Sequence, residues 1–353
     1  MIIVGTDFHF GARNDDPVVM QAQLDFLDNV FFPTIENHKV THFLDLGDTW
    51  DKRKIHNIRT YNIFRARFFD RLEALGINTI MLIGNHDVYY KNTNDVNSVS
   101  MLERDYENIH VVNGFEDITI GNYTFGMMSW INNQNYEQAK EFIKTSKADI
   151  VCGHFEASGF EILPGVKTEH GIDPKMFSHF DQVWSGHFHI PSKVGNFEYI
   201  GNPFDLNWSD YKQRKSVMLF DETTGDRQFV ENPYRLFASL SYTDDIDILA
   251  FDFEPYKNKF VRLNIESLQI KDNSKLSLFI DKMQQVAYNL DVSETGKLEF
   301  SDVSTDPESD VEIDTLSKIV SVVSSMELAG LDKSKLTDKF KQLYEDAEER
   351  MSQ

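Results

Sequence analysis

Short apolar runs that stop at a glycine recur through the first half of the chain. The clearest covers residues 80–83 and leads directly into Gly84, Asn85, His86 and Asp87. A short apolar run that ends at glycine is typical of a buried strand that stops at a turn. The same pattern predicts four more strands that stop at or just before a glycine, at residues 1–4, 41–46, 149–152 and 181–184.

Apolar residues at helical spacing fill the intervals between these strands. They predict helices over residues 17–38, 57–75, 96–104 and 136–145, and a hairpin over residues 118–128. Strands that alternate with helices predict an α/β fold, here a β-sandwich flanked by helices.

The pattern changes near residue 232. Strands at 236–240, 260–265 and 297–303 and a helix at 274–290 predict a small α+β domain over residues 232–303, after a first domain over residues 1–231. Residues 291–314 hold nine acidic residues and one lysine, so we interpret residues 304–312 as an acidic, solvated linker.

The tail, residues 313–353, carries two amphipathic helical patterns. A capping box at Ser309 and Glu312 opens the first pattern, whose apolar stripe covers residues 313–323, and the second stripe covers residues 336–347. Two helices this short are marginal in isolation, so the stripes must be buried, either on the first domain or on a partner chain.

Composition and cysteine content indicate the class of protein. With 353 residues, of which 41% are hydrophobic and 26% charged, the chain resembles soluble proteins of two domains. No apolar run approaches the roughly 18 residues of a membrane span, and no basic segment predicts a signal peptide at the start. Cys152 is the only cysteine, which excludes a disulfide within the chain and fits a reducing compartment such as the cytoplasm.

Polar side chains with metal-ligand chemistry follow all five strands of the first group. They are Asp7, His9, Asp48, Asn85, His86, His154, His187 and His189. In Asp7-x-His9 and His187-x-His189 both side chains point to the same side of an extended segment, because side chains alternate with a period of two. Imidazole, carboxylate and amide groups without thiolates suit Mn²⁺, Fe or Zn²⁺ better than a structural zinc site.

Without His86, seven of these side chains remain as possible ligands. Seven are too many for one ion, and they suit two ions that share a bridging ligand. Asp48 is the natural bridging carboxylate, and two ions would clamp a displacement at phosphorus and activate water. A proton for the leaving oxygen would come from His86, with Asp87 orienting its ring. Each residue alone also fits an ordinary role, as a buried histidine, a helix cap or a turn residue, so the prediction rests on five strand ends taken together.

The five motifs resemble, in order and spacing, those of the calcineurin-like metallophosphoesterases. They are Asp7-x-His9, Gly47-Asp48-x-x-Asp51, Gly84-Asn85-His86-Asp87, Gly153-His154 and Gly186-His187-x-His189. Within that superfamily the chain looks most like the SbcD-type DNA repair nucleases, especially the recombination endonuclease subunits of tailed bacteriophages. Residues 199–210 carry this closer resemblance, which covers the first domain by motif and the remainder by layout.

The resemblance implies a two-Mn²⁺ exonuclease and endonuclease, with Mg²⁺ a poorer substitute, that acts with an SMC-like ATPase in DNA recombination, repair and end processing. It assigns one ion to Asp7, His9, Asp48 and His189, and the other to Asp48, Asn85, His154 and His187, with His86 catalytic. Several cellular relatives carry histidine at the position of Asp51, so the role of this residue stays open.

The resemblance also implies an assembly. The α+β domain would contact DNA, and the C-terminal helices would dock on the coiled-coil base of the ATPase. The chain would act as a homodimer within a heterotetramer, in the host cytoplasm if a phage encodes it.

The net charge of −22 is unusual for a DNA-binding chain. Autonomous nucleic-acid binders usually carry a basic surface, so metal ions and a partner subunit would have to supply the positive field. Four basic residues are candidate phosphate contacts, and a solvated helix start explains them equally well. They are Lys52, Arg53, Lys54 and Arg59.

Two other functions compete with a DNA nuclease. The first is a phosphatase or phosphodiesterase of the same superfamily that acts on a small or nucleotide substrate; the hundred or so residues after the first domain argue against it. The second is a scaffold with a degenerate site, against which the intact ligand set argues.

Overall fold

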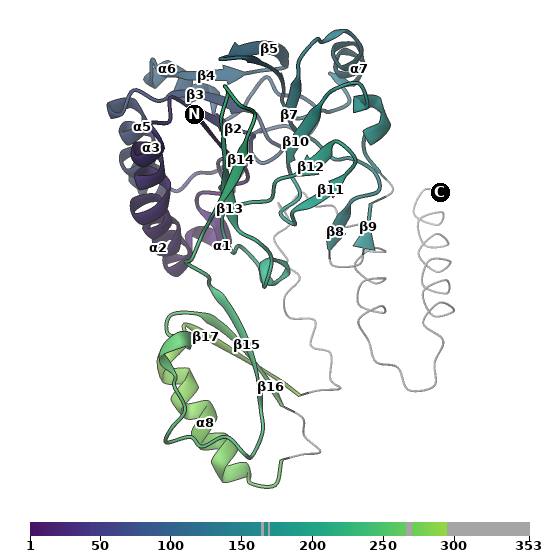
Figure 1. Ribbon diagram of the computed structural model, residues 1–353. Coiled ribbons are helices and arrows are strands. Elements are labelled where there is room, and N and C mark those ends of the chain that lie inside the picture. The colour runs from purple at the N-terminus through teal and green to yellow at the C-terminus, as the bar shows by residue number, and fades with distance from the viewer. Residues whose placement is uncertain (164–165, 169, 266–269, 295–353) are drawn as a thin grey trace, which may run out of the picture. The chain divides into compact units, whose positions relative to one another are not determined.

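The computed structural model describes the whole chain except residues 164–165, 169, 266–269 and 295–353. The chain divides into two compact units (Figure 1). Of the described residues, the first unit holds those within Met1–Ile162 and Lys167–Leu236, and the second holds residues 163, 166, 237–265 and 270–294. The expected linker and helical tail, and the strand expected at 297–303, lie outside the described residues.

Two six-stranded sheets form the centre of the first unit. The first sheet has the order β14-β13-β1-β2-β3-β4, with strands β1 Ile2–Gly5, β2 His42–Asp45, β3 Asn78–Leu82, β4 Ile109–Val112, β13 Ser216–Phe220 and β14 Arg227–Glu231. The second has the order β11-β12-β10-β7-β6-β5, with strands β5 Phe115–Ile120, β6 Tyr123–Met128, β7 Ile150–His154, β10 Gln182–Gly186, β11 Ser192–Val194 and β12 Phe197–Tyr199. Two short strands, β8 Glu161–Leu163 and β9 Val166–Lys167, form a separate two-stranded sheet.

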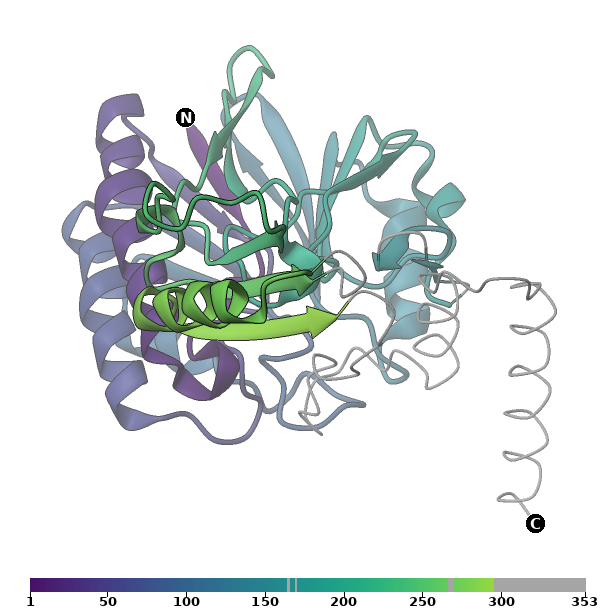
Figure 2. The same ribbon diagram turned by 90° about the horizontal axis from the view of Figure 1, so that it is seen from below.

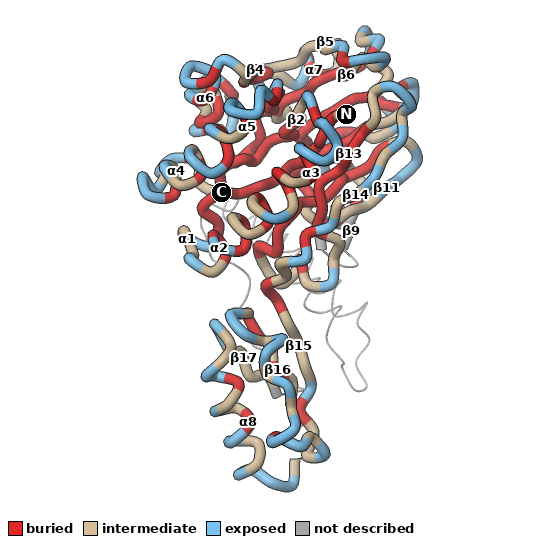
Figure 3. Tube along the Cα trace, turned by 60° about the vertical axis from the view of Figure 1, so that its left-hand side comes forward, coloured by how far each residue is buried: buried red, intermediate tan, exposed pale blue. Residues whose placement is uncertain are grey.

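The two sheets pack apolar side chains against one another. Val4 and Leu82 of the first sheet share one buried cluster with Phe125, Cys152 and Trp184 of the second. Figure 3 shows the central strands of this unit as almost continuously buried. Burial of one face of each sheet against the other is the defining property of a sandwich, so the predicted fold class is confirmed.

Two long helical segments lie along the outer face of the first sheet (Figure 2). They form at the predicted positions, but each is interrupted by a π-helical stretch: α2 Pro17–Phe26, η1 Leu27–Phe31 and α3 Phe32–His38, then α4 Ile58–Phe64, η2 Arg65–Phe69 and α5 Asp70–Ala74. Phe31 and Phe68, one from each π-helical stretch, bring their rings to 6.2 Å and 5.4 Å from the ring of Phe8. This aromatic layer supports the loop that follows β1.

The outer face of the second sheet is covered by α7 Tyr136–Thr145 and η3 Pro174–Phe177. Ala139, Ile143 and Phe177 pack there against Val151 and Val183. The remaining short elements of the first unit are α1 Ala12–Asp15, α6 Ser100–Asp105 and η4 Trp208–Asp210. None of the helices in the described part of the chain has both the length and the apolar character of a membrane span.

The second unit contains a parallel three-stranded sheet of order β15-β16-β17, with strands β15 Phe237–Tyr242, β16 Phe260–Ile265 and β17 Asn289–Glu294. Its helices are η5 Glu254–Tyr256 and α8 Asn273–Val286, and Phe279 and Met283 of α8 share a buried cluster with Val261 and Leu263. The predicted helix over 274–290 is wrong at its end, because Asn289 already pairs with Phe260 in the sheet. Leu290 suits both an amphipathic helix and a strand, so periodicity did not separate them.

Candidate active site

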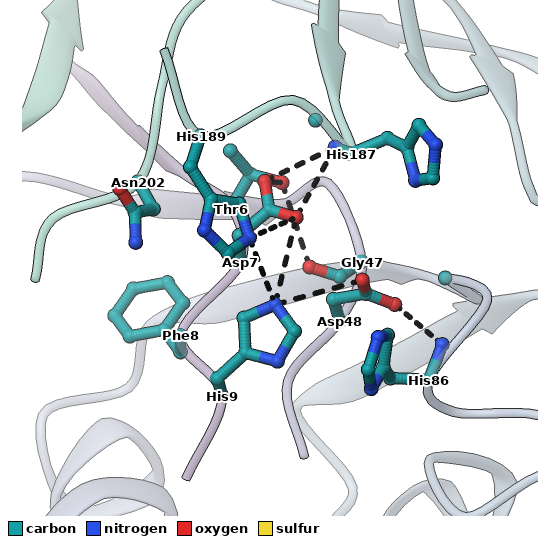
Figure 4. A network of polar contacts seen from close by, with 12 residues as sticks. Thr6, Asp7, Phe8, His9, Gly47, Asp48, His86, His187, His189 and Asn202 are labelled. Atoms are coloured by element: carbon teal, nitrogen blue, oxygen red, sulfur yellow. Dashed lines mark hydrogen bonds and ion pairs between the residues drawn. The ribbon is translucent and has the colours of Figure 1, made fainter. Parts of the chain in front are cut away.

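The polar strand ends meet at one edge of the first unit. Strands β1, β2 and β3 are parallel neighbours in one sheet, and β7 and β10 are parallel neighbours in the other. Parallel neighbours end at the same edge, where α/β sheets place their ligands. We call the cluster formed there the strand-end site; it brings together Asp7, His9, Asp48, Asn85, His86, His154, His187 and His189. Figure 4 shows six of them: Asp7, His9, Asp48, His86, His187 and His189.

A first group of possible metal ligands consists of Asp7, His9 and His189. The Nε2 atoms of His9 and His189 are 3.2 Å apart, and each lies 3.9 Å from Oδ1 of Asp7. Figure 4 shows both rings directed toward the Asp7 carboxylate. Two imidazole nitrogens and a carboxylate oxygen therefore converge on one small volume.

A second group consists of Asp48, His154 and His187, with Asn85 beside them. Oδ1 of Asn85 lies 3.0 Å from Nε2 of His154 and 2.8 Å from Nδ1 of His187. Asp48 joins the two groups, because its Oδ2 is 3.3 Å from Nε2 of His154 and 3.7 Å from Nε2 of His9.

The chemistry of these donors fits divalent cations. His154 donates from Nδ1 to the carbonyl oxygen of Leu46 at 2.7 Å, which aims its Nε2 at the oxygens of Asp48 and Asn85. Tying one imidazole nitrogen to a carbonyl and presenting the other is the usual arrangement of a metal-binding histidine. The same side chain atoms would repel one another without a proton or a cation between them.

Charge in the strand-end site also favours cations. Burial opposes protonation of His9 and His154, but the neighbouring carboxylates outweigh it and raise the pKa of each imidazole to about 9. Burial lowers the pKa of His189 to about 4, and burial together with the charge of His154 holds the pKa of His187 well below its usual value. Imidazole binds a metal in its neutral form, which His187 and His189 already favour. Metal binding would displace the protons from His9 and His154.

His86 is held next to both ligand groups. Its main-chain N–H donates to Oδ1 of Asp48 at 2.7 Å, and a ring nitrogen belongs to a possible ligand set with His9 and Asp48. Its Nδ1 donates to the carbonyl oxygen of Asp51 at 2.6 Å. Asp87, expected to orient this ring, instead accepts hydrogen bonds from the amides of Asp48, Gly84 and Trp50.

Asp51, whose role the sequence left open, contacts a predicted ligand through its side chain. Its Oδ1 lies 3.3 Å from Nδ1 of His9, the ring nitrogen that faces away from Asp7. A carboxylate on the outer nitrogen of a ligand histidine fixes the ring orientation and the proton position. Asp51 thus supports His9 with its carboxylate and His86 with its carbonyl.

The glycines of the motifs are required by close approach. A Cβ on Gly84 would lie 2.1 Å from Oδ1 of Asp48, and one on Gly186 would lie 1.9 Å from Oγ1 of Thr6. Four site residues also adopt left-handed backbone, which non-glycine residues rarely do and which clusters at functional sites. They are Asp7 (φ 53°), His9 (φ 45°), Asp48 (φ 54°) and His187 (φ 89°).

Two supporting residues escaped the sequence reasoning. Thr6 donates from Oγ1 to Oδ2 of Asp7 at 2.8 Å, and its position beside the first motif could have revealed it. Lys215 is buried and donates to the carbonyl oxygen of His189 at 3.2 Å, while also bonding Asn202 and Asp210. No spacing in the sequence links Lys215 to His189. This network accounts for two polar residues of the 199–210 segment, Asn202 and Asp210.

The four candidate phosphate contacts have different surroundings. Lys52 pairs with Asp15 at 3.7 Å, and Arg53 is buried with 8% of its surface exposed. Lys54 is exposed and lies over the ring of Tyr89, and Arg59 is exposed in the first turn of α4. Lys54 and Arg59 are therefore the more accessible of the four.

Comparison with known proteins bears on the resemblance that the five motifs indicate. No protein-family model matches the chain. It is 27% identical over 348 residues, 97% of each chain, to exonuclease subunit 1 of Enterobacteria phage T4. A solved structure of an archaeal phosphodiesterase is 14% identical and covers 65% of this chain and 98% of its own, with a TM-score of 0.33. The similarity to the phage protein confirms the resemblance drawn from the motifs.

Proposed function

We propose that this chain is a metal-dependent phosphodiesterase, the nuclease subunit of a DNA recombination and repair complex. The observation that carries the proposal is the pair of ligand groups joined by Asp48, an arrangement that suits two cations sharing a carboxylate. The similarity over 97% of both chains to a protein named exonuclease subunit 1 supports a nucleic acid as the substrate.

We assign the side chains to two Mn²⁺ ions. Asp7, His9, Asp48 and His189 would hold one, and Asp48, Asn85, His154 and His187 the other. Mn²⁺ accepts imidazole nitrogen together with carboxylate oxygen, whereas Mg²⁺ prefers oxygen ligands and retains its waters. Mg²⁺ should therefore support activity poorly.

Bound cations supply Lewis acidity toward the phosphoryl group and lower the pKa of water. The protein itself fixes the geometry of the remaining groups. Because His86 donates from Nδ1 to the Asp51 carbonyl, its Nε2 is the ring atom left to face the leaving oxygen, and it would give a proton there from the imidazolium form. Burial lowers the pKa of His86, while the charge of Asp48 favours the protonated ring. The Asp87 carboxylate, by binding the amides of Asp48 and Gly84, holds the turns that carry Asp48 and His86 together.

We also propose how the chain is assembled, on the basis of its resemblance to SbcD-type nucleases and of the two apolar stripes in its tail. The α+β domain over 232–303 contacts DNA, and the tail over 313–353 docks its two apolar stripes on a coiled-coil, SMC-like ATPase. The chain acts as a homodimer within that complex, in the cytoplasm. Truncation near Asp310 should leave an Mn²⁺-dependent nuclease that no longer co-purifies with the ATPase; undiminished binding would exclude the tail as the docking element.

The function is tested by nucleotide release from linear duplex DNA by the full-length chain, in Mn²⁺, in Mg²⁺ and in chelator. An aryl phosphodiester serves as the small substrate, and Asp48→Asn as the matched inactive variant. We expect release in Mn²⁺ that is lost in chelator and in the variant. Hydrolysis of the aryl ester alone, with and without the ATPase, would assign the site to a small-molecule phosphodiesterase.

A further inference from the structure

Two neighbouring tyrosines are exposed just beyond the strand-end site. Tyr89 and Tyr90 are 40% and 52% exposed, and their ring centroids lie 4.7 Å apart at an interplanar angle of 72°. Most of the large aromatic side chains in the described part of the chain are instead buried. A single exposed aromatic residue is ordinary, but two adjoining rings beside a proposed active site form a surface for a ligand.

The tyrosines are fixed relative to the site by their own segment. Tyr89 follows His86 by three residues, so their Cα atoms lie within about 11 Å of each other. Val88 between them is fully buried and pairs with Asn97, and the N–H of Tyr89 donates to the carbonyl of Val96 at 2.8 Å. A ligand group resting on these rings would therefore lie next to a substrate bound at His86.

A cation from a second segment approaches one of these two rings, that of Tyr89. Nζ of Lys54 lies 5.7 Å from the ring centroid of Tyr89. The two segments are joined at the site, where His86 donates to the Asp51 carbonyl and Asp87 accepts from the amide of Trp50. Two aromatic rings with a lysine beside them are complementary to a nucleotide, whose base stacks and whose phosphate is anionic.

Because the chain is strongly acidic, a surface that binds DNA without relying on basic side chains would be useful here. At a net charge of −22, and with Lys52 already paired to Asp15, the side chains around the site add little attraction for phosphates beyond that of the proposed cations. Stacking does not depend on net charge and strengthens binding by roughly 5- to 150-fold per base. Bases inside a duplex have both faces covered by their neighbours, so only an unpaired nucleotide can use the surface fully.

We propose that Tyr89 and Tyr90, with Lys54, form a stacking platform for an unpaired base of the DNA strand whose phosphodiester lies in the strand-end site. This inference rests on the proposed nuclease function and specifies its substrate, a strand with an unpaired or frayed end. The base adjacent to the cleaved bond stacks on the tyrosines, and Lys54 pairs with a neighbouring phosphate.

The test compares the full-length protein with Tyr89→Ala/Tyr90→Ala and Tyr89→Phe/Tyr90→Phe variants. Tyr136→Ala is the matched control, because Tyr136 is 41% exposed and carries a lysine over its ring, Lys140 at 5.3 Å, but lies on α7. Paired substrates carry either normal bases or abasic nucleotides near the cleaved end. The wild type, the phenylalanine variant and the control should prefer normal bases by roughly 5- to 150-fold in kcat/KM, and the alanine variant should lose that preference.

A second readout separates this inference from the proposed function. In chelator, without turnover, a single-stranded oligonucleotide containing 2-aminopurine should lose fluorescence on binding the wild type and not on binding the alanine variant. If the wild type cleaves no DNA, the nuclease function fails and the fluorescence alone decides whether the platform exists. An alanine variant that keeps the base preference or the quenching overturns the platform, as does one that loses only its ATPase partner, which would make the tyrosines a protein interface.

Discussion

His9 and His189 lie 180 positions apart in the chain, yet their Nε2 atoms are 3.2 Å apart. One follows the first strand of one sheet and the other follows β10 of the second sheet. Two such nitrogens at this distance require a shared proton or a shared cation, and the carboxylate of Asp7 faces both. The meeting of the two sheets therefore creates the ligand group.

Substitution of His86 should separate catalysis from metal binding. In His86→Ala we expect the Mn²⁺ content to match the wild type, while the cleavage rate falls by about 10²- to 10⁴-fold, the usual contribution of a general acid. Rates are measured at saturating Mn²⁺, with metal content determined on the same sample. Near-normal turnover would remove His86 from the chemistry, and loss of metal would make it a ligand.

Asp51 should act on metal affinity through His9. In Asp51→Ala the carboxylate 3.3 Å from Nδ1 of His9 is lost, while the main-chain carbonyl that holds His86 remains. We expect Mn²⁺ to bind about 10- to 100-fold more weakly, as is usual when the support of a ligand histidine is removed. Asp51→Asn, which keeps an acceptor oxygen, should recover part of the affinity. Equal Kd values in all three proteins would show that Asp51 has no positioning role.

Lys215 should be required for folding stability. Its side chain and that of Asp210 are fully buried as an ion pair, so Lys215→Met leaves a buried carboxylate without its cation. We expect a loss of about 3–5 kcal/mol in the free energy of unfolding, measured by denaturant titration in chelator. Lys193→Met is the control, because Lys193 is half-exposed where it pairs with Glu198 at 3.5 Å, and should change stability by less than about 1 kcal/mol.

The same pair predicts a dependence of stability on pH. Burial raises the pKa of Asp210, but the charges of Lys215 and His189 outweigh it and hold that pKa below its ordinary value of 3.8. A carboxylate with a lowered pKa stabilises the fold above its ordinary pKa, and this stability is lost as the pH falls. Between about pH 5 and pH 3 the wild type should lose stability more steeply than Asp210→Asn. Parallel curves would contradict this assignment.

The sequence predicted the sandwich and the strand-end residues because both depend on local chemistry. Glycine is required where the end of a buried strand lies directly against another segment of the chain. At Gly84, for example, a Cβ atom would collide with Asp48. The strand ends then carry His and Asp side chains at fixed offsets from each glycine. Such offsets are visible in a linear sequence.

Contacts between distant segments were not predictable in this way. Lys215 supports His189 across a loop whose course depends on β12 and β13, and β13 itself ends without the glycine that marked the other strands. The His86 ring is oriented by the main-chain carbonyl of Asp51 and not, as the sequence had predicted, by the Asp87 side chain. Every residue has a main-chain carbonyl, so residue type could not reveal this contact. Left-handed backbone at Asp48 suits an aspartate, but most aspartates do not adopt it, so residue type alone did not predict it.

The central claim, a site for two cations bridged by Asp48, is tested most directly by counting bound Mn²⁺. Equilibrium dialysis of the full-length chain should give two Mn²⁺ per chain, as the two-metal site requires. Asp48→Asn is the matched variant, because asparagine tolerates the left-handed backbone at this position, φ 54°, better than alanine. It should bind neither ion tightly. One ion or none in the wild type, or two ions in Asp48→Asn, would contradict the account.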